Sequence, residues 1–132
     1  MRDAPEGAAH LLEMPAAPLV RNHLGTVHAA AQFALAEAAS AECLHRHFAA
    51  AAGTVVPVVR RVEAKYRAPG TGTLLAYAAL DPVTQQTFLS ELDRCGRALA
   101  AVQVSLKDSA GTVTFAGTFE WFVARASAPA MP

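Results

Sequence analysis

The sequence predicts an α+β fold in which an antiparallel β-sheet wraps around one long helix. First, residues 27–52 are dominated by strong helix formers and contain neither Pro nor Gly. Second, residues 58–68, 97–107 and 112–123 alternate with the two-residue period of strands. Third, the last two of these strands each have one apolar face, and only the 27–52 helix offers enough apolar surface to cover them.

The predicted long helix begins after Thr26, a good N-cap, and ends near Ala52, just before Gly53. Between Val27 and Leu44 its side chains are small and apolar on nearly every side. This pattern predicts a helix with a sheet or a partner packed all around it. The last turns carry groups that suit the negative end of the helix dipole, namely His45, Arg46 and His47.

Ahead of this helix, residues 10–14 are expected to form an edge strand or a short helix. Behind it, residues 58–68 form a predicted strand, followed by turn residues at 69–72 and a second, short strand at 73–80. The first of these strands places Arg60, Val62, Ala64 and Tyr66 on one face and Arg61, Glu63, Lys65 and Arg67 on the other.

A short helix follows, with Asp81 as its cap and Pro82 at its first position. Three apolar residues repeat at helical spacing before Gly96 ends the pattern: Phe88, Leu89 and Leu92. The final two strands are joined by a predicted hairpin turn at 108–111, and residues 126–132 are expected to form a loose tail. The predicted order is therefore an N-terminal element, a long helix, and four strands with a small helix between them.

Composition narrows the class of protein. At 132 residues the chain suits one domain with a real core. Eleven basic and eleven acidic side chains cancel, which argues against a nucleic-acid binder that relies on a broad basic field. Without a long apolar run or a signal peptide, a cytoplasmic protein with no membrane partner is expected. Cys43 and Cys95 lack a zinc-binding spacing, so both are predicted to be core thiols, and no metal is expected.

Glu37 is an acid inside the apolar part of the long helix, which also holds Glu42. A lone acid there is most often partly exposed or bound by a neighbouring hydroxyl, but burial would raise its pKa and make it a general base. Glu37 lies eleven residues beyond Thr26, so about 16 Å separates it from the predicted helix N-terminus. One chain therefore cannot bring Asn22, the free helix N–H groups and Glu37 together, whereas a two-fold dimer with antiparallel helices could.

Several motifs occur in an order that resembles the hot-dog superfamily of acyl-CoA thioesterases, particularly the phenylacetic-acid-pathway group. The resemblance covers most of the chain. It includes Gly96-Arg97 entering a strand, the 108–111 turn and a final aromatic strand. Its core is a set of four residues with the spacing of that group: Asn22, Gly25, His28 and Glu37.

The resemblance implies a single hot-dog domain over residues 1–132 and a homodimer whose sheets join edge to edge, often paired into a homotetramer. The implied activity is hydrolysis of an acyl-CoA or another acyl thioester, with no cofactor beyond the CoA of the substrate. Glu37 would be the base or nucleophile, and Asn22 would orient substrate or water. The backbone N–H groups of Ala29 and Ala30 would hold the oxyanion. Gly25, Thr26 and His28 would support the site. Arg61, Lys65 and Arg67 could bind the phosphates of CoA. The alternative for these three cations is that they form a solvated outer face of the sheet.

The sequence departs from that group at two points. Ala29-Ala30 replaces a glycine pair, which adds methyl groups where the substrate would approach, and Glu37 replaces an Asp. Besides hydrolysis, two alternatives remain: a non-catalytic binder of acyl-CoA or acyl-carrier thioesters, and a dehydratase or hydratase on the same fold. The last normally needs a His in a Pro/Gly-rich loop, and none of the five histidines lies in such a motif.

Overall fold

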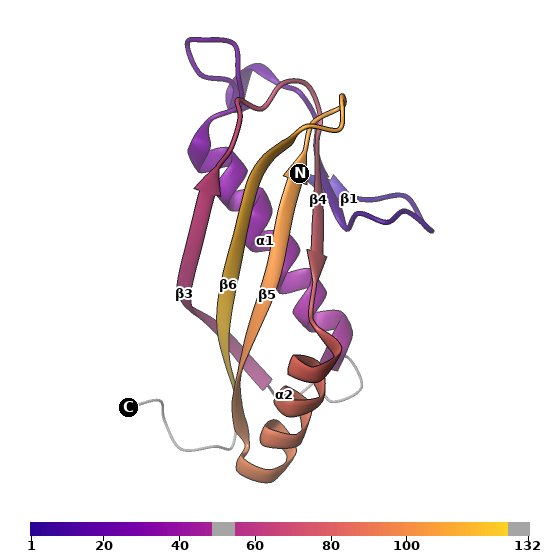
Figure 1. The fold of residues 1–132 in the computed structure, drawn as a ribbon, viewed down its shortest axis with the longest axis vertical. Helices are drawn as coiled ribbons and strands as arrows, with labels where there is room; N and C mark the ends of the chain where they lie inside the picture. The colour runs from indigo at the N-terminus through magenta and orange to yellow at the C-terminus, as the bar shows by residue number, and fades with distance from the viewer. Residues whose placement is uncertain (49–54, 127–132) are drawn as a thin grey trace.

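The computed structural model describes residues 1–48 and 55–126 of the protein, and in this part it contains one antiparallel sheet and two α-helices (Figure 1). The strand order is β1-β2-β4-β5-β6-β3. The strands are β1 (Arg2–Asp3), β2 (Leu12–Met14), β3 (Val55–Tyr66), β4 (Leu74–Ala79), β5 (Arg97–Lys107) and β6 (Val113–Arg125). The helices are α1 (Ala29–Phe48) and α2 (Pro82–Cys95), with a short 3-10 turn, η1, at Pro18–Val20. The predicted α+β architecture is confirmed.

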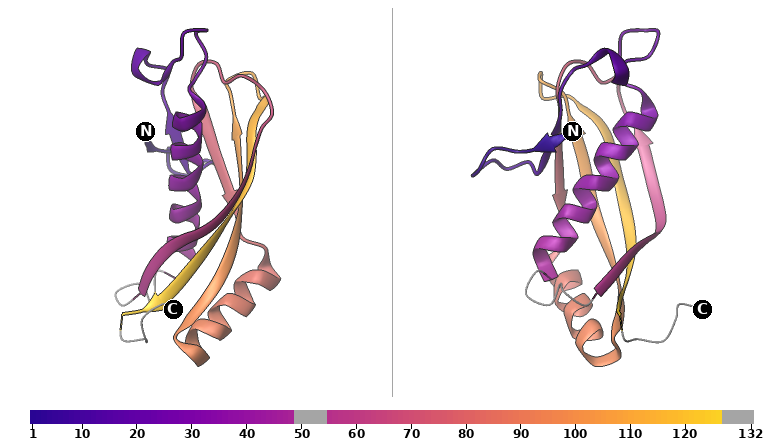
Figure 2. Two further views of the ribbon diagram at one scale, coloured as in Figure 1. Left: turned by 90° about the vertical axis from the view of Figure 1, so that its left-hand side faces the viewer. Right: turned by 180° about the vertical axis from the view of Figure 1, so that it is seen from behind.

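The sheet curves along one side of α1, while α2 lies at one end of the molecule (Figure 2). One face of α1 is buried against the sheet through Leu35, Ala36, Ala39, Cys43 and Leu44. Ala30 and Ala34, on the opposite face, are exposed. The sheet therefore covers one side of α1, and a partner over the opposite side stays a prediction.

The β5–β6 hairpin confirms the predicted strands and turn. β5 has the predicted bounds, and its buried side chains are Ala98, Ala100, Val102, Val104 and Leu106. In the turn, a carboxylate oxygen of Asp108 accepts hydrogen bonds from the N–H groups of Ala110 and Thr112, each at 3.0 Å. Gly111 has φ 83°, a left-handed value that costs little only for glycine. Local turn chemistry thus fixes this hairpin.

Helix α2 also forms as predicted. The Asp81 carboxylate accepts from the Thr84 N–H at 3.1 Å, and Gly96 ends the helix at φ 75°. Phe88 is buried, but Leu89 is 37% exposed, so its predicted place in the apolar stripe is wrong. Only a narrow stripe of α2 packs against β5. Because adjacent residues lie about 100° apart around a helix, Leu89 lies outside the stripe that contains Phe88.

The start of α1 differs from the prediction. Thr26 is not the N-cap, because its hydroxyl donates to the Asn22 side chain and the chain at Thr26 is still part of a loop. The first helical bond runs from the Gln32 N–H to the His28 carbonyl, so His28 precedes the first turn and α1 begins at Ala29. The predicted end at Ala52 lies outside the described residues, as do residues 127–132 of the predicted tail.

Strand β3 contains a β-bulge that periodicity did not predict. Val59 pairs with Trp121, but the next pair joins Arg61 to Glu120, so Arg60 is an extra residue without a partner. The predicted placement of Arg60 on the face of Val62 is therefore wrong. β3 is an edge strand of the sheet and contains Pro57, a residue that sheets tolerate mainly at their edges.

The N-terminal element is a strand rather than a helix, and it is not at the edge. β2 pairs with β4 on one side and with β1 on the other. β1 was not predicted, since two residues are too few to show a period. Within residues 1–48 and 55–126, no helix is long and apolar enough to cross a membrane.

Candidate functional site

The loop before α1 is organised by the side chain of Asn22. Its Oδ1 accepts hydrogen bonds from the Leu24 N–H at 2.9 Å, and from the N–H and hydroxyl of Thr26, both at 3.1 Å. Gly25 supplies the positive φ of 80° that this tight loop needs. Among the described residues, the carboxamide nitrogen of Asn22 has no hydrogen-bond acceptor. The oxygen therefore holds the loop, and the nitrogen is left as a donor.

Two backbone bonds fasten the end of this loop to the rest of the fold. The Val27 N–H donates to the Gly70 carbonyl at 2.9 Å, and the His28 N–H donates to the Val20 carbonyl at 2.7 Å. The imidazole of His28 is exposed, so His28 supports the loop through its backbone. These contacts determine where the first turn of α1 begins.

The N-terminus of α1 presents free donors. The first N–H groups of any helix lack partners within it, and the dipole makes this end positive. Here the groups concerned belong to Ala29, Ala30 and Ala31, and Ala29 and Ala30 are exposed. This arrangement can hold a carbonyl oxygen that gains negative charge.

A cavity of about 370 Å³ opens beside this first turn. The residues of its wall that matter here are Asn22, Ala29, Gln32, Tyr66 and Arg67. The Tyr66 hydroxyl donates to the Ala29 carbonyl at 3.2 Å, and its ring packs edge-on against Phe115 with the centroids 5.3 Å apart. The end of β3 is thereby held against the start of α1, which closes one side of the cavity.

The structure adds Gln32 and Tyr66 to the predicted site. Gln32 is only 4% exposed, although the sequence showed it merely as a polar interruption of an apolar helix. Tyr66 looked like one more residue of a strand. The sequence signal that could have indicated Gln32 is its position as a polar residue among small apolar ones. No sequence pattern joins Tyr66 to Ala29, because 37 residues separate them.

Glu37 lies away from this cavity in the same chain. It is eight residues beyond Ala29, so about 12 Å of helix separates the two, less than the 16 Å expected from a start at Thr26. Its side chain is half-buried rather than buried, and its carbonyl accepts from the Ser40 hydroxyl at 2.7 Å. A single chain therefore brings Asn22 and Ala29 together but leaves Glu37 apart.

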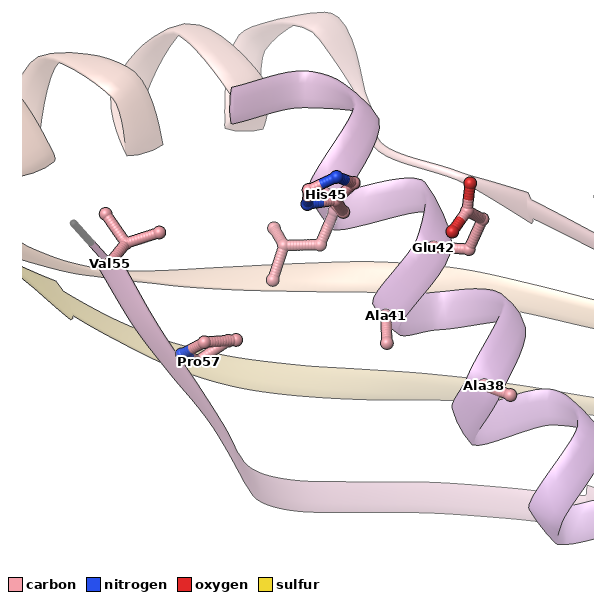
Figure 3. A pocket seen from close by; sticks show the side chains of 7 residues that line it. Ala38, Ala41, Glu42, His45, Val55 and Pro57 are labelled. Carbon is pink, nitrogen blue, oxygen red and sulfur yellow. The ribbon is translucent and has the colours of Figure 1, made fainter. Parts of the chain in front are cut away.

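A second cavity, of about 430 Å³, lies between the C-terminal half of α1 and the start of β3 (Figure 3). Its walls are mainly apolar, formed by Ala38, Ala41, Leu44, Val55 and Pro57, and Glu42 and His45 also line it. Glu42 forms an ion pair with Arg46, N–O 3.0 Å. Because residues four apart are neighbours on a helix, Ala41 is next to Glu37. Glu37 therefore stands near one end of an apolar cavity.

The three predicted phosphate-binding cations do not lie in one group. Arg61 lines a small depression on the outer face of the sheet, with Glu63, Thr118 and Glu120. Lys65 is exposed, and Arg67 follows the end of β3 and lines the cavity beside α1. Of these cations, only Arg67 adjoins the helix N-terminus.

Neither cysteine belongs to these cavities. Cys43 is buried, and burial raises the pKa of its thiol above the ordinary value of 9.0. Cys95 is exposed at the end of α2, so the prediction of two core thiols is wrong for Cys95. In the part of the chain that the structure describes, no group of three or more His, Cys, Asp or Glu side chains could hold a metal ion.

A curved antiparallel sheet around one long helix, with an Asn-bearing loop at the helix N-terminus, is the hot-dog fold of thioesterase-like proteins. The chain belongs to the family described as a domain of unknown function, DUF4442, whose match spans residues 6–123. No curated protein matches the chain.

Three solved structures illustrate the likeness. A Pseudomonas aeruginosa protein of unknown function, described as a probable thioesterase, is 26% identical with TM-score 0.73, over 86% of this chain and 74% of that chain. A Bacillus halodurans protein crystallised with CoA is 21% identical with TM-score 0.65, over 84% of this chain and 64% of that chain. A Haemophilus influenzae thioesterase is 16% identical with TM-score 0.66, over 87% and 71% of the two chains.

Proposed function

We propose that this protein is an acyl-CoA thioesterase that works as a homodimer. The observation that carries the proposal is the cavity at the N-terminus of α1, whose wall contains both Asn22, with its unpaired carboxamide nitrogen, and Ala29, the first residue of the helix. Hydrolysis of a thioester needs donors at the position of the developing oxyanion. The CoA in the Bacillus halodurans structure and the thioesterase descriptions of other relatives agree with this substrate class.

The carboxylate in this proposal is Glu37 of the partner subunit. It would accept a proton from water, whose oxygen then attacks the thioester carbonyl carbon, and the C–S bond breaks as the thiolate leaves and takes up a proton. The long edge strand β3 supports a dimer, because its outer backbone groups are free to pair with a second copy. Pairing about a two-fold axis would place the two α1 helices antiparallel, which brings Glu37 towards the other Ala29.

In this arrangement, the apolar cavity between α1 and β3 receives the acyl group. Its walls are mainly apolar, and it adjoins Glu37 through Ala41. A volume of about 430 Å³ lies within the range of ligand pockets. The carboxylate would then stand where the apolar acyl chain meets the polar thioester.

A second candidate function is binding of acyl thioesters without hydrolysis. The exposed methyl groups of Ala29 and Ala30 favour it, because they occupy the surface that a substrate carbonyl must approach. The same cavity would still hold the thioester. Binding of a CoA analogue without release of free thiol would distinguish this function from catalysis.

The test of the proposed function is release of free thiol from short, medium, long and aromatic acyl-CoAs. Wild type is compared with Glu37→Gln, and Glu91→Gln serves as a control because Glu91 is also a half-buried glutamate on a helix, pairs with Arg94 and lies outside both cavities. Turnover that vanishes only in Glu37→Gln supports the proposal. Equal turnover in wild type and Glu37→Gln would exclude Glu37 as the base, and a folded wild type without turnover on any substrate would favour the binding function.

A further inference from the structure

The loop before α1 exposes two leucines. Leu19 in η1 is 93% exposed and Leu24 is 73% exposed. Both lie within three residues of Asn22, which is in the wall of the cavity at the N-terminus of α1. A single exposed apolar side chain is ordinary on a protein surface, but apolar side chains grouped beside a binding cavity indicate contact with a partner. The two leucines are therefore candidates for such a contact.

The surface around these leucines is positively charged. Residues 15–34, which include the whole loop, and residues 66–72, which follow β3, contain no Asp or Glu. Their exposed guanidinium groups belong to Arg21 and Arg67, and neither forms an ion pair with any described residue. Asp108 in the β5–β6 turn is buried, and its carboxylate accepts backbone N–H groups. The chain has no net charge, so this is a local excess of positive charge.

Backbone contacts hold the two segments together. Arg21 pairs with Val27 in a β-bridge, and the Val27 N–H donates to the Gly70 carbonyl at 2.9 Å. Gly70 lies three residues beyond Arg67. The loop before α1 and the segment after β3 thus lie at one end of the molecule, and α2 lies at the other (Figure 1). The exposed leucines and the free cations form one surface, made of Leu19, Arg21, Leu24 and Arg67, which we call the loop surface.

The chemistry of the loop surface distinguishes two carriers of a thioester. Both CoA and an acidic protein with a pantetheine arm carry negative charge, so the two cations suit either one. Beyond its pantetheine arm, CoA is a nucleotide with phosphate groups, which gain little from exposed leucines. A protein interface combines apolar side chains with surrounding charges that are complementary to those of the partner. Leucines between cations therefore favour a protein carrier.

We infer that the loop surface docks an acidic carrier protein, whose pantetheine arm delivers the acyl thioester to the cavity at the N-terminus of α1. Leu19 and Leu24 supply the apolar contact, and Arg21 and Arg67 attract acidic side chains of the carrier. The inference rests on the proposed thioester site and deepens it, since it names the carrier of the substrate.

The experiment compares one acyl group on two carriers, octanoyl-CoA and an octanoylated acidic acyl carrier protein. The double variant Leu19→Gln/Leu24→Gln should lower kcat/KM for the carrier-protein substrate about tenfold, because truncated interface anchors commonly cost this much. Its kcat/KM for octanoyl-CoA should stay within about twofold of wild type, because a nucleotide makes no comparable apolar contact. Val83→Gln is the matched control, since Val83 is 72% exposed on α2.

A second variant tests the charge of the loop surface. Arg21→Glu should lower kcat/KM for the carrier-protein substrate about tenfold at low salt, and the loss should shrink as the salt concentration rises. Arg97→Glu reverses an exposed arginine at the start of β5 and should leave this value unchanged. A loss in Arg21→Glu that is independent of salt would contradict an electrostatic contact with the carrier.

Other outcomes overturn the inference. These are equal losses on both carriers in the double leucine variant, no loss on either, or hydrolysis of octanoyl-CoA alone by the wild type. A changed molar mass of this variant in sedimentation would assign the leucines to a contact with a second copy, which also overturns it.

A wild type that hydrolyses neither thioester would refute the proposed function, and the docking is then tested separately. Surface plasmon resonance measures binding of the carrier protein that bears a free pantetheine arm. Binding that Leu19→Gln/Leu24→Gln weakens supports the inference, whereas equal binding or no binding overturns it.

Discussion

Trp121 on β6 donates its indole N–H to the hydroxyl of Ser40 on α1 over 3.0 Å, and both side chains are buried. The same hydroxyl donates to the carbonyl of Glu37 at 2.7 Å. These two bonds connect the sheet to the turn of α1 that carries Glu37. The position of Glu37 along the sheet therefore depends on a polar contact inside an otherwise apolar core.

Ser40→Ala should lower the free energy of unfolding by about 1–3 kcal/mol, because the indole N–H of Trp121 would remain buried without a partner. Urea denaturation measures the change. Ser90→Ala, at an exposed site on α2, is the control and should stay within about 0.5 kcal/mol of wild type. Equal stability of the two variants would show that the Ser40–Trp121 bond contributes nothing.

Asn22→Asp and Asn22→Ala should separate the two roles of this side chain. The Asp variant keeps the oxygen that holds the loop, and a negative charge near the helix N-terminus is favourable, so stability should be retained. The Ala variant removes three hydrogen bonds and should cost about 1–3 kcal/mol. If the carboxamide nitrogen donates to substrate, Asn22→Asp lowers kcat/KM without destabilising the protein, whereas full activity in this variant would remove that role.

The two cysteines should react with a thiol reagent at very different rates. Burial raises the pKa of Cys43 and shields it, while Cys95 is exposed, and the thiolate is the reacting form. In the native protein, one thiol should react quickly and the other only on unfolding. Cys95→Ser should abolish the fast phase and Cys43→Ser should leave it unchanged. Two fast thiols would contradict the burial of Cys43.

Glu13 should make the stability of the N-terminal hairpin depend on acid pH. Its hydrogen bonds with His10 and then Arg2 lower the pKa of the carboxyl below its usual 4.5. A lowered pKa in the folded state means that the contribution to stability is full above pH 4.5 and is lost as pH falls through the folded value. Urea curves of wild type and Glu13→Gln should therefore differ at about pH 7 and converge at low pH. A difference independent of pH would contradict this linkage.

Local chemistry explains the elements that were predicted correctly. Asp81 and Gly96 bound α2 because a cap needs only the residues next to it. The β5–β6 hairpin follows from Asp108 and Gly111, with alternating apolar residues on either side. The start of α1 was harder to predict, because the Thr26 hydroxyl donates a hydrogen bond to the Asn22 side chain and does not cap the helix.

The candidate site was predicted in part. Asn22 and Ala29 were named from the sequence, and both lie in the wall of one cavity. Tyr66 and Gln32 were not named, because their places depend on the end of β3 meeting the start of α1. Glu37 was named as a base, and its approach to the cavity of a second copy stays a prediction.

By itself, the sequence determined the type and order of the main elements, since helix formers, caps, turns and period-two strands act over a few residues. Only the tertiary structure decided which side of α1 is buried, where β3 gains the extra residue Arg60, and that the amide of Gln32 lies in a cavity wall. The physical reason is that burial and pairing depend on contacts between segments distant in the chain. A hydrophobic period shows that a face will be covered, but not which side chains of the covering element meet it.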